Sequence, residues 1–310
     1  MTSRTVIQLL LLAAIWGGSF PFMRAAAGPF GPAPLILLRL VFAAACLVPF
    51  CLATSRRPGQ GARPGQLAVV ALIMCATPFT LLAFASLSLT AGFTSLLNAV
   101  TPLMTALVGR VVWRQRLAGP QWLGIFIGIA GVGFLCQGSI SFKPGGTGWA
   151  VVAALAATLC YGVGGQLSKR WLAPLDPDTT TAGTMLAGSL WLAIPGLLTW
   201  PEVTPAPRAW VAVFLLGSGC TAVAYVLYYR LLKQAGPTQV ASVTFLVPAF
   251  SLVWSALFLG ERLSVRMLAA FLVILVGTAL TTGVFRLPAR RLPVTKGAET
   301  RDGSPPGPSA

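Results

Sequence analysis

The chain is dominated by long apolar runs that are separated by short polar or charged segments. A membrane-spanning helix needs roughly 20 mostly apolar residues, so each uncharged run can be measured against that length. The run between Arg63 and Arg110 is about twice one span and therefore has to fold back once, near Thr90. Because the apolar runs are continuous and lack the alternation of barrel strands, helices are predicted.

This measurement predicts an all-α membrane protein with ten transmembrane helices. The predicted spans cover residues 6–23, 33–52, 66–87, 91–112, 121–137, 148–167, 180–198, 209–232, 238–259 and 265–285. The remaining segment, residues 286–310, is basic and rich in Gly and Pro, so a disordered basic tail is expected.

Composition agrees with the spans, because 56% hydrophobic and 9% charged residues leave too little polar surface for a soluble globule of 310 residues. The net charge of +16 comes from scattered short clusters of Lys and Arg, which is not the continuous basic face of a nucleic-acid-binding protein. Anionic lipid head groups are the expected partner of these charges, and no nucleic acid is expected.

The distribution of positive charge predicts the orientation, because Lys and Arg are retained on the cytoplasmic side of membrane proteins. With the N-terminus inside, sixteen of the 22 Lys and Arg residues lie on the cytoplasmic side and five lie outside. We therefore expect both termini to be cytoplasmic, as an even number of spans requires.

The chain also matches itself at an offset of about 145 residues. Matched residues include Trp16 with Tyr161, Pro102 with Pro248, and Gly131 with Gly277. Two five-span halves are predicted, residues 1–138 and 139–285, followed by the tail 286–310. An odd number of spans per half makes the second copy enter the membrane from the other side, so the repeat is inverted.

Residues 14–20 read AIWGGSF, and residues 258–263 read FLGERL before the helix that contains Gly277. With these motifs and the paired prolines Pro102 and Pro248, the chain resembles the EamA type of the drug/metabolite transporter superfamily. The resemblance implies a ten-helix carrier whose helices one, four, six, eight and nine surround a central cavity.

One position departs from the family pattern. The family usually carries an acidic residue at the end of the fourth helix as well as the ninth, whereas this chain reads Arg114-Gln115-Arg116 there. A role that requires a carboxylate in both halves is therefore not expected. Glu261, at the end of helix nine, is expected to end that helix and to position the turn into helix ten.

Several kinds of chemistry lack the necessary residues. The chain has no His, and its six Asp and Glu residues fall in predicted loops, span ends or the tail. A Ser-His-Asp triad, a His-ligated metal site and a paired-carboxylate hydrolase are therefore excluded, and no cofactor is expected. Without buried acidic residues, a proton relay through a carboxylate is not expected either. Gly124, Gly128 and Gly131 are spaced for close helix packing in lipid.

Polar and aromatic residues inside the spans are the candidate substrate-binding residues, because lipid offers them no partner. They are Trp16, Ser19, Asn98, Thr101, Tyr161, Gln166, Thr221, Tyr225, Tyr228 and Thr244. The alternative for each is an interhelical hydrogen bond or a place at the lipid interface. Pro102 and Pro248 each remove one helical hydrogen bond, so they are expected to bend helices four and nine and are candidate hinges.

Arg39 lies inside the second span, near its outer end. Its side chain is expected to extend along the helix to the lipid head groups. The alternative is that Arg39 faces the cavity and attracts an anionic group of the substrate.

The resulting hypothesis is a secondary transporter that moves a small organic solute across a bacterial plasma membrane by alternating access. Amino acids or related metabolites, drug-like solutes included, are the substrates that the resemblance implies, with export favoured. The alternatives are a polytopic enzyme acting on lipids and a structural or channel-like membrane protein. A homodimer is left open.

The charge bias makes the orientation testable. Arg57, Lys169 and the tail should be cytoplasmic, while Lys143 and Arg262 should face outward. A cysteine placed in the segment 56–66 should stay unmodified by an impermeant thiol reagent added to sealed cells. Modification of that cysteine in sealed cells would overturn the assignment.

Overall fold

A computed structural model describes residues 3–55, 61, 63–138, 140–143 and 145–284 of the chain. The predicted tail, residues 286–310, and the residues 56–60 of the first polar loop lie outside the described residues. Regular structure in the described part consists of helices, without a strand.

The described residues form ten helical spans that are long and apolar enough to cross a membrane, which confirms the predicted number. Each overlaps one predicted span. The continuous spans are α1 (Ser3–Phe30), α2 (Pro32–Thr54), α7 (Gly119–Cys136), α8 (Gly148–Trp171), α9 (Pro177–Leu198) and α14 (Val265–Thr282). The composite spans are α3, η1 and α4 (Pro64–Ala71, Leu72–Ala76, Thr77–Ala85), α5 and α6 (Ala91–Asn98, Thr101–Val112), α10, η2 and α11 (Pro207–Phe214, Leu215–Val223, Ala224–Ala235), and α12 and α13 (Pro237–Ala241, Val243–Leu259).

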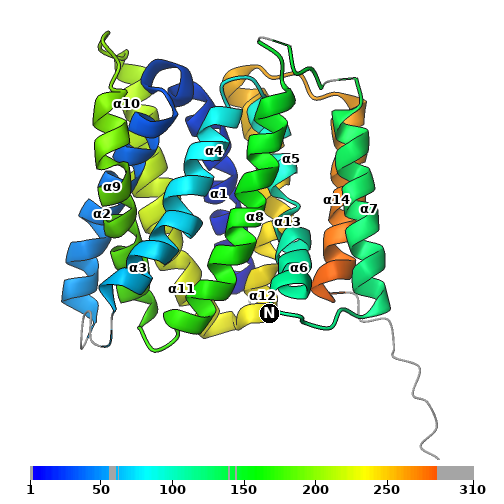
Figure 1. Ribbon diagram of the computed structural model, residues 1–310, viewed down its shortest axis with the longest axis horizontal. Coiled ribbons are helices and arrows are strands. Elements are labelled where there is room, and N and C mark those ends of the chain that lie inside the picture. The colour runs from blue at the N-terminus through cyan, green and yellow to red at the C-terminus, as the bar shows by residue number, and fades with distance from the viewer. Residues whose placement is uncertain (1–2, 56–60, 62, 139, 144, 285–310) are drawn as a thin grey trace, which may run out of the picture.

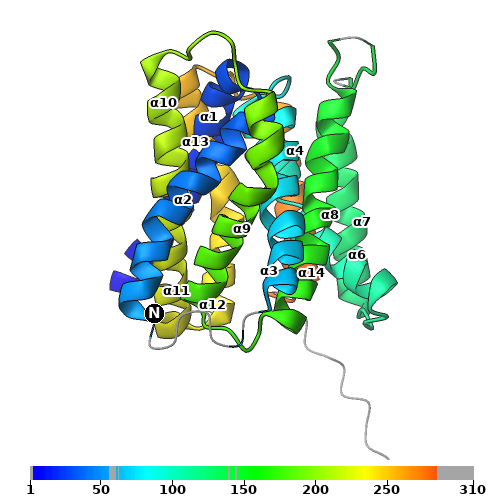
Figure 2. The same cartoon turned by 60° about the vertical axis from the view of Figure 1, so that its left-hand side comes forward.

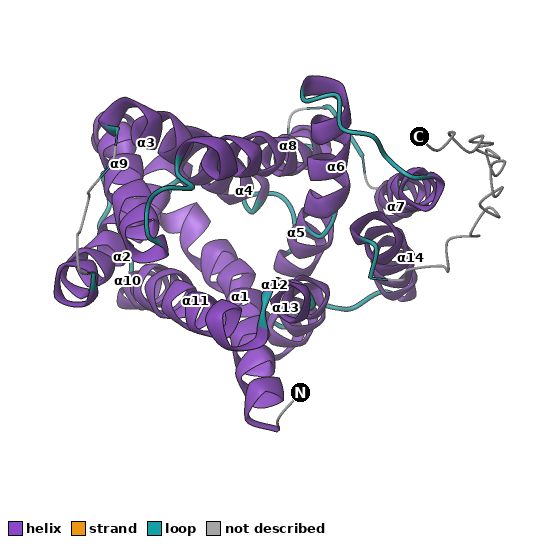
Figure 3. Cartoon of the chain, turned by 90° about the horizontal axis from the view of Figure 1, so that it is seen from below, coloured by secondary structure: helices purple, strands orange, loops and turns teal. Residues whose placement is uncertain are grey.

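The spans stand side by side, and the beginning of α1 and the end of α14 lie at the same face of the bundle, the lower face in Figure 1. We call this the N-terminal face and the other the opposite face. Seen along the bundle, α7 and α14 pack together at one edge, while α2 and α9 form a pair at the other (Figure 3).

The α2–α9 pair is joined by a carboxylate at the N-terminal face, and Figure 2 brings this pair forward. The Asp176 carboxylate accepts hydrogen bonds from the Thr179 backbone N–H (2.9 Å) at the start of α9 and from the Ser55 hydroxyl (3.0 Å) after α2. Partial burial raises the pKa of Asp176, but the hydrogen bonds from Thr179 and Ser55 outweigh that effect and lower it.

Backbone irregularities occur at matched places in the two halves. The third and eighth spans each contain a π-helical segment, η1 from Leu72 and η2 from Leu215, and these starts lie 143 residues apart. The fourth and ninth spans are each interrupted, at Ala99 and at Ser242. The interruption of the fourth span directly precedes Pro102, as the proline predicts. In the ninth span it lies at Ser242, and Pro248 is inside the continuous helix α13.

The α7–α14 pair is held at close range by glycines, as their spacing predicts. A Cβ atom built on Gly277 would lie 2.6 Å from the Gly128 backbone nitrogen, and one built on Gly124 would lie 2.5 Å from the Gly277 carbonyl oxygen. Lipid tails give two apolar helices no hydrophobic reason to associate, so this contact has to come from close packing of the backbones.

We therefore expect Gly277→Ala to lower the thermal stability of the detergent-purified protein. The methyl group would meet backbone atoms that cannot move away, and such overpacking costs about 1–3 kcal/mol. Gly133→Ala in α7 is the matched control, because a Cβ there meets nothing within 4 Å. Equal melting temperatures for the two variants would contradict the packing described here.

Candidate functional site

Arg39 lies in the interior of the bundle, with 6% of its surface exposed. It shares a face of α2 with the buried residues Ile36 and Ala43, which lie three residues before it and four residues after it. That face packs on η2, where a Cβ atom on Gly217 would approach the Arg39 carbonyl oxygen to 2.7 Å. The expectation that Arg39 extends to the head groups is therefore wrong, because its helix face points at protein.

Two neighbours hold the guanidinium of Arg39. Its Nε atom donates a hydrogen bond to the Thr221 hydroxyl at 3.1 Å, and its central carbon lies 3.7 Å from the centre of the Phe79 ring. The second contact has the geometry of a cation–π interaction. The Thr221 hydroxyl in turn donates to the Leu216 carbonyl, five residues earlier, at 2.8 Å, as a π-helical segment permits.

The groups that face Arg39 carry no negative charge. Tyr161, Tyr225, Cys75 and Cys220 interact with it electrostatically, and no carboxylate of the described residues does. Burying an ion without a counter-charge costs several kcal/mol, of which the contacts above recover a part. Residues of α2, η1 and α4 from the first half and of α8, η2 and α11 from the second half surround this group, which we call the arginine centre.

Aromatic rings continue from the arginine centre along α11. The ring centre of Trp16 lies 6.1 Å from that of Tyr225 and 5.5 Å from that of Tyr228. Tyr229 extends the set, at 5.0 Å from Tyr228 and 6.2 Å from Tyr225. These four rings are half-buried. Trp16 of α1 packs on Tyr225 and Tyr228 in the part of α11 that leads to the N-terminal face, while Tyr229 hydrogen-bonds with Thr181 of α9.

Two residues of this region were missed by the sequence interpretation. Phe79 packs beneath Arg39, and its ring centre lies 6.3 Å from that of Tyr161. A phenylalanine in an apolar span has no signal that separates it from the core. Tyr229 directly follows Tyr228, so the same rule that selected Tyr228 could have found it.

The other candidates lie in different places. Ser19 is buried and hydrogen-bonds with Cys220, next to the arginine centre. The Asn98 side-chain oxygen is buried without a hydrogen-bond partner, and the Thr101 hydroxyl donates to the Asn98 carbonyl at 2.7 Å.

Two further candidates, Gln166 and Thr244, have contacts elsewhere. Gln166 accepts a long hydrogen bond from Gln115 at 3.5 Å. Thr244 is exposed and donates to the Ala241 carbonyl, so no contact brings it to the arginine centre.

Glu261 has a structural role in addition to the one expected. Helix α13 ends at Leu259 and is followed by Gly260, whose φ of 64° is left-handed. The Glu261 carboxylate then reaches the start of α5. It accepts hydrogen bonds from the backbone N–H groups of Ala91 (2.8 Å) and Gly92 (3.2 Å). The Glu261 side chain therefore caps the fourth span, while its backbone N–H donates to the Ser255 carbonyl (3.2 Å) at the end of the ninth, so Glu261 joins the two spans at the opposite face.

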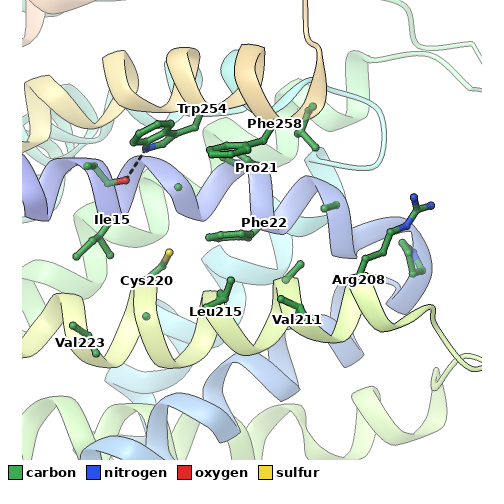
Figure 4. Close-up of a pocket in the computed structure, with 17 residues that line it drawn as sticks. Ile15, Pro21, Phe22, Arg208, Val211, Leu215, Cys220, Val223, Trp254 and Phe258 are labelled. Carbon is green, nitrogen blue, oxygen red and sulfur yellow. Dashed lines mark hydrogen bonds between the residues drawn. The ribbon is translucent and has the colours of Figure 1, made fainter.

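An apolar groove of about 840 Å³ lies between α1, the α10–η2 segment and α13 (Figure 4). Phe22, Leu215 and Trp254 line it, and Trp254 is fixed by a hydrogen bond from its indole nitrogen to the Ala14 carbonyl at 3.0 Å. Leu215 and Phe258 are also exposed on the outer surface, so the groove opens sideways. Cys220 both lines this groove and faces Arg39, but none of the predicted site residues lines it.

A protein-family model matches the chain twice, over residues 3–137 and 148–283, and it describes the EamA-like transporter family. The chain belongs to this family. Its fold is thus that of an EamA transporter, and the chain is a multi-pass membrane protein.

Relatives of this EamA protein are named as transporters. It is 24% identical to "Uncharacterized transporter YyaM" of Bacillus subtilis, over 91% of this chain and 94% of that one. It is 27% identical to an "Uncharacterized transporter" of Archaeoglobus fulgidus, over 91% and 98% of the two chains. A third relative, "Probable terminal-alkyne amino-acid exporter" of Streptantibioticus cattleyicolor, is 27% identical over 84% of this chain and 86% of its own length.

A solved structure, described as "Crystal structure of protein", has the same fold. It superposes with a TM-score of 0.65 at 21% identity and covers 94% of this chain and 100% of its own.

Removal of the Glu261 carboxylate should weaken the contact between the fourth and ninth spans. We expect Glu261→Ala to destabilise the purified protein by about 1–2 kcal/mol, the cost of losing a helix cap. Glu261→Gln should cost less, because its side-chain oxygen still accepts one of the two bonds. The control is Glu202→Ala in an exposed loop. A melting temperature of Glu261→Ala equal to that of the control would rule out the capping role.

Proposed function

We propose that this EamA protein is a secondary transporter that moves a small organic solute, an amino acid or a related metabolite, across a bacterial plasma membrane. The observation that carries the proposal is the arginine centre, a buried group of charged, polar and aromatic side chains to which both halves contribute. Secondary transporters bind their substrates at the interface between their repeats. The solute and the anionic lipid head groups are the proposed partners.

Alternating access is the proposed mechanism, with the two halves rocking around the arginine centre. Irregular backbone is tolerated at membrane depth where it lines a cavity or is buried in protein, and η1 and η2 both contribute residues to this centre. Pro102 and Pro248 are proposed as hinges within the fourth and ninth spans. Glu261 ties these spans at the opposite face, so opening of that face requires its two hydrogen bonds to break.

Export is the proposed direction and amino acids are the proposed substrates, supported by the relative that is named as an amino-acid exporter. Exchange or facilitated diffusion is the proposed mode of energy coupling. The carboxylates of Asp176 and Glu261 serve as helix caps at the two faces, and this leaves neither of them free for a proton relay through the interior.

The aromatic residues provide the test. In proteoliposomes loaded with a radiolabelled mixture of L-amino acids, the wild type should give saturable efflux. Trp16→Ala and Tyr161→Ala should each reduce the initial rate about tenfold or more, because an aromatic side chain that contacts a ligand often dominates its binding.

The matched control is Trp149→Ala, since Trp149 starts the same helix as Tyr161 but is 63% exposed. Its transport should equal that of the wild type at equal reconstitution. Wild-type rates in both the Trp16 and Tyr161 variants would reject the proposed lining, and the lack of any saturable efflux from the wild type would favour a structural protein.

A further inference from the structure

We propose that Arg39 binds the carboxylate of the transported solute, so that the substrates are small organic acids, amino acids included, and not neutral or cationic solutes. This inference rests on the proposed function and names the substrate class of the same centre. It is based on the two Nη atoms of the guanidinium, which donate no hydrogen bond to the described residues.

Arg39 is more than nine-tenths buried, yet its terminal nitrogens have no hydrogen-bond partner among the residues that the structure describes. Its Nε atom donates to Thr221 and one face lies on the Phe79 ring, but neither Nη atom donates a hydrogen bond to any described residue. Neither Nη atom is fully covered, because the fully buried side-chain atoms without a partner belong to Gln8, Asn98 and Ser251. Both Nη atoms therefore keep part of their surface uncovered and their donor capacity unused.

A carboxylate matches these free donors in geometry and in charge. The planar guanidinium fork of Arg presents parallel N–H groups at the spacing of two carboxylate oxygens. The protein has already oriented the fork through Thr221 and Phe79, so binding requires little further ordering. The solute would also supply the counter-charge that the described neighbours of Arg39 lack. A cationic solute would meet an unpaired positive charge instead.

A purely structural role for Arg39 would require fewer contacts of its side chain. As a strut between α2, α4 and η2, the side chain would need only its Nε contact and its Phe79 contact. The two Nη atoms, which donate to no described residue, would then have no role. A strut also predicts no difference between an acid and its neutral amide, and the experiment uses this difference.

The aromatic rings indicate what accompanies the carboxylate. Tyr225 faces Arg39 and contacts Trp16, and Tyr228 and Tyr229 continue along α11 toward the N-terminal face. Half-buried rings offer apolar faces with few charged groups, so the body of the solute should be apolar or aromatic. Phenylacetate and its neutral isostere phenylacetamide therefore form a suitable pair of probes, together with L-phenylalanine and L-phenylalaninamide.

The first arm uses the detergent-purified wild type and the proteoliposome assay. Phenylacetate and L-phenylalanine should raise the melting temperature and inhibit efflux of the labelled amino acids, while the two amides should do so about tenfold less well, as the loss of a charged hydrogen bond predicts. Equal effects of acid and amide would overturn the inference without any variant.

The second arm uses variants of the centre. Arg39→Gln should remove the preference for acids over amides, and Arg39→Lys, which keeps the charge but not the fork, should reduce it. Thr221→Val leaves both Nη atoms in place but removes one contact that orients them, so it should reduce the preference less than Arg39→Gln does. Arg208→Gln at the rim of the apolar groove is the matched control and should behave as the wild type. A folded Arg39→Gln variant that still prefers acids would overturn the inference.

The two proposals fail in different ways. A third set of proteoliposomes carries labelled neutral and cationic probes, phenylacetamide and tetraphenylphosphonium. Saturable flux of these probes without flux of acids would retain the transporter and overturn the role of Arg39. Flux of neither set would overturn both proposals.

Discussion

The hydrocarbon core of a bilayer supplies no hydrogen-bond partners, so the polar groups of the ten spans have to be satisfied by the protein itself. Ser and Thr hydroxyls do this locally by donating to a carbonyl one turn earlier, as Thr80, Thr105, Thr184, Ser218 and Thr282 do. At the faces, carboxylates accept the free N–H groups at helix starts. Asp176 and Glu261 therefore bind backbone N–H groups, as capping side chains do at helix starts in general.

The arginine centre is an exception, because it contains donors that no described residue satisfies. Thr221 and Phe79 hold Arg39 from two sides, yet no described residue accepts a hydrogen bond from its Nη atoms. The π-helical segments are part of the reason, since the wider turn of η2 lets Thr221 donate back to Leu216 while its lone pairs remain available to Arg39. Because an unsatisfied charge in this environment is costly, a use in binding accounts for its presence better than packing does.

The number and placement of the spans followed from the sequence because run length and hydropathy are local properties. The glycine contact of α7 was also predictable, since spacing alone places Gly124 and Gly128 on one face. The orientation of the Arg39 side chain could not be predicted from the sequence. Apolar residues surround it on every side of α2, so no periodic pattern shows which face meets protein, and only the packing of η2 against that helix decides it. Likewise, Glu261 bonds to residues that lie 169 and 170 positions away.

The two halves share a scaffold but differ at the position of Arg39. At the offset of 145 residues, Arg39 corresponds to Thr184, whose hydroxyl is satisfied by the Thr180 carbonyl. Both side chains approach Cys75, which interacts with Arg39 and hydrogen-bonds with Thr184. A second arginine in place of Thr184 would bring two unpaired cations to the same thiol, and their repulsion in a low dielectric would destabilise the bundle. At this matched pair the buried cation therefore stands in the first half, and an uncharged hydroxyl stands in the second.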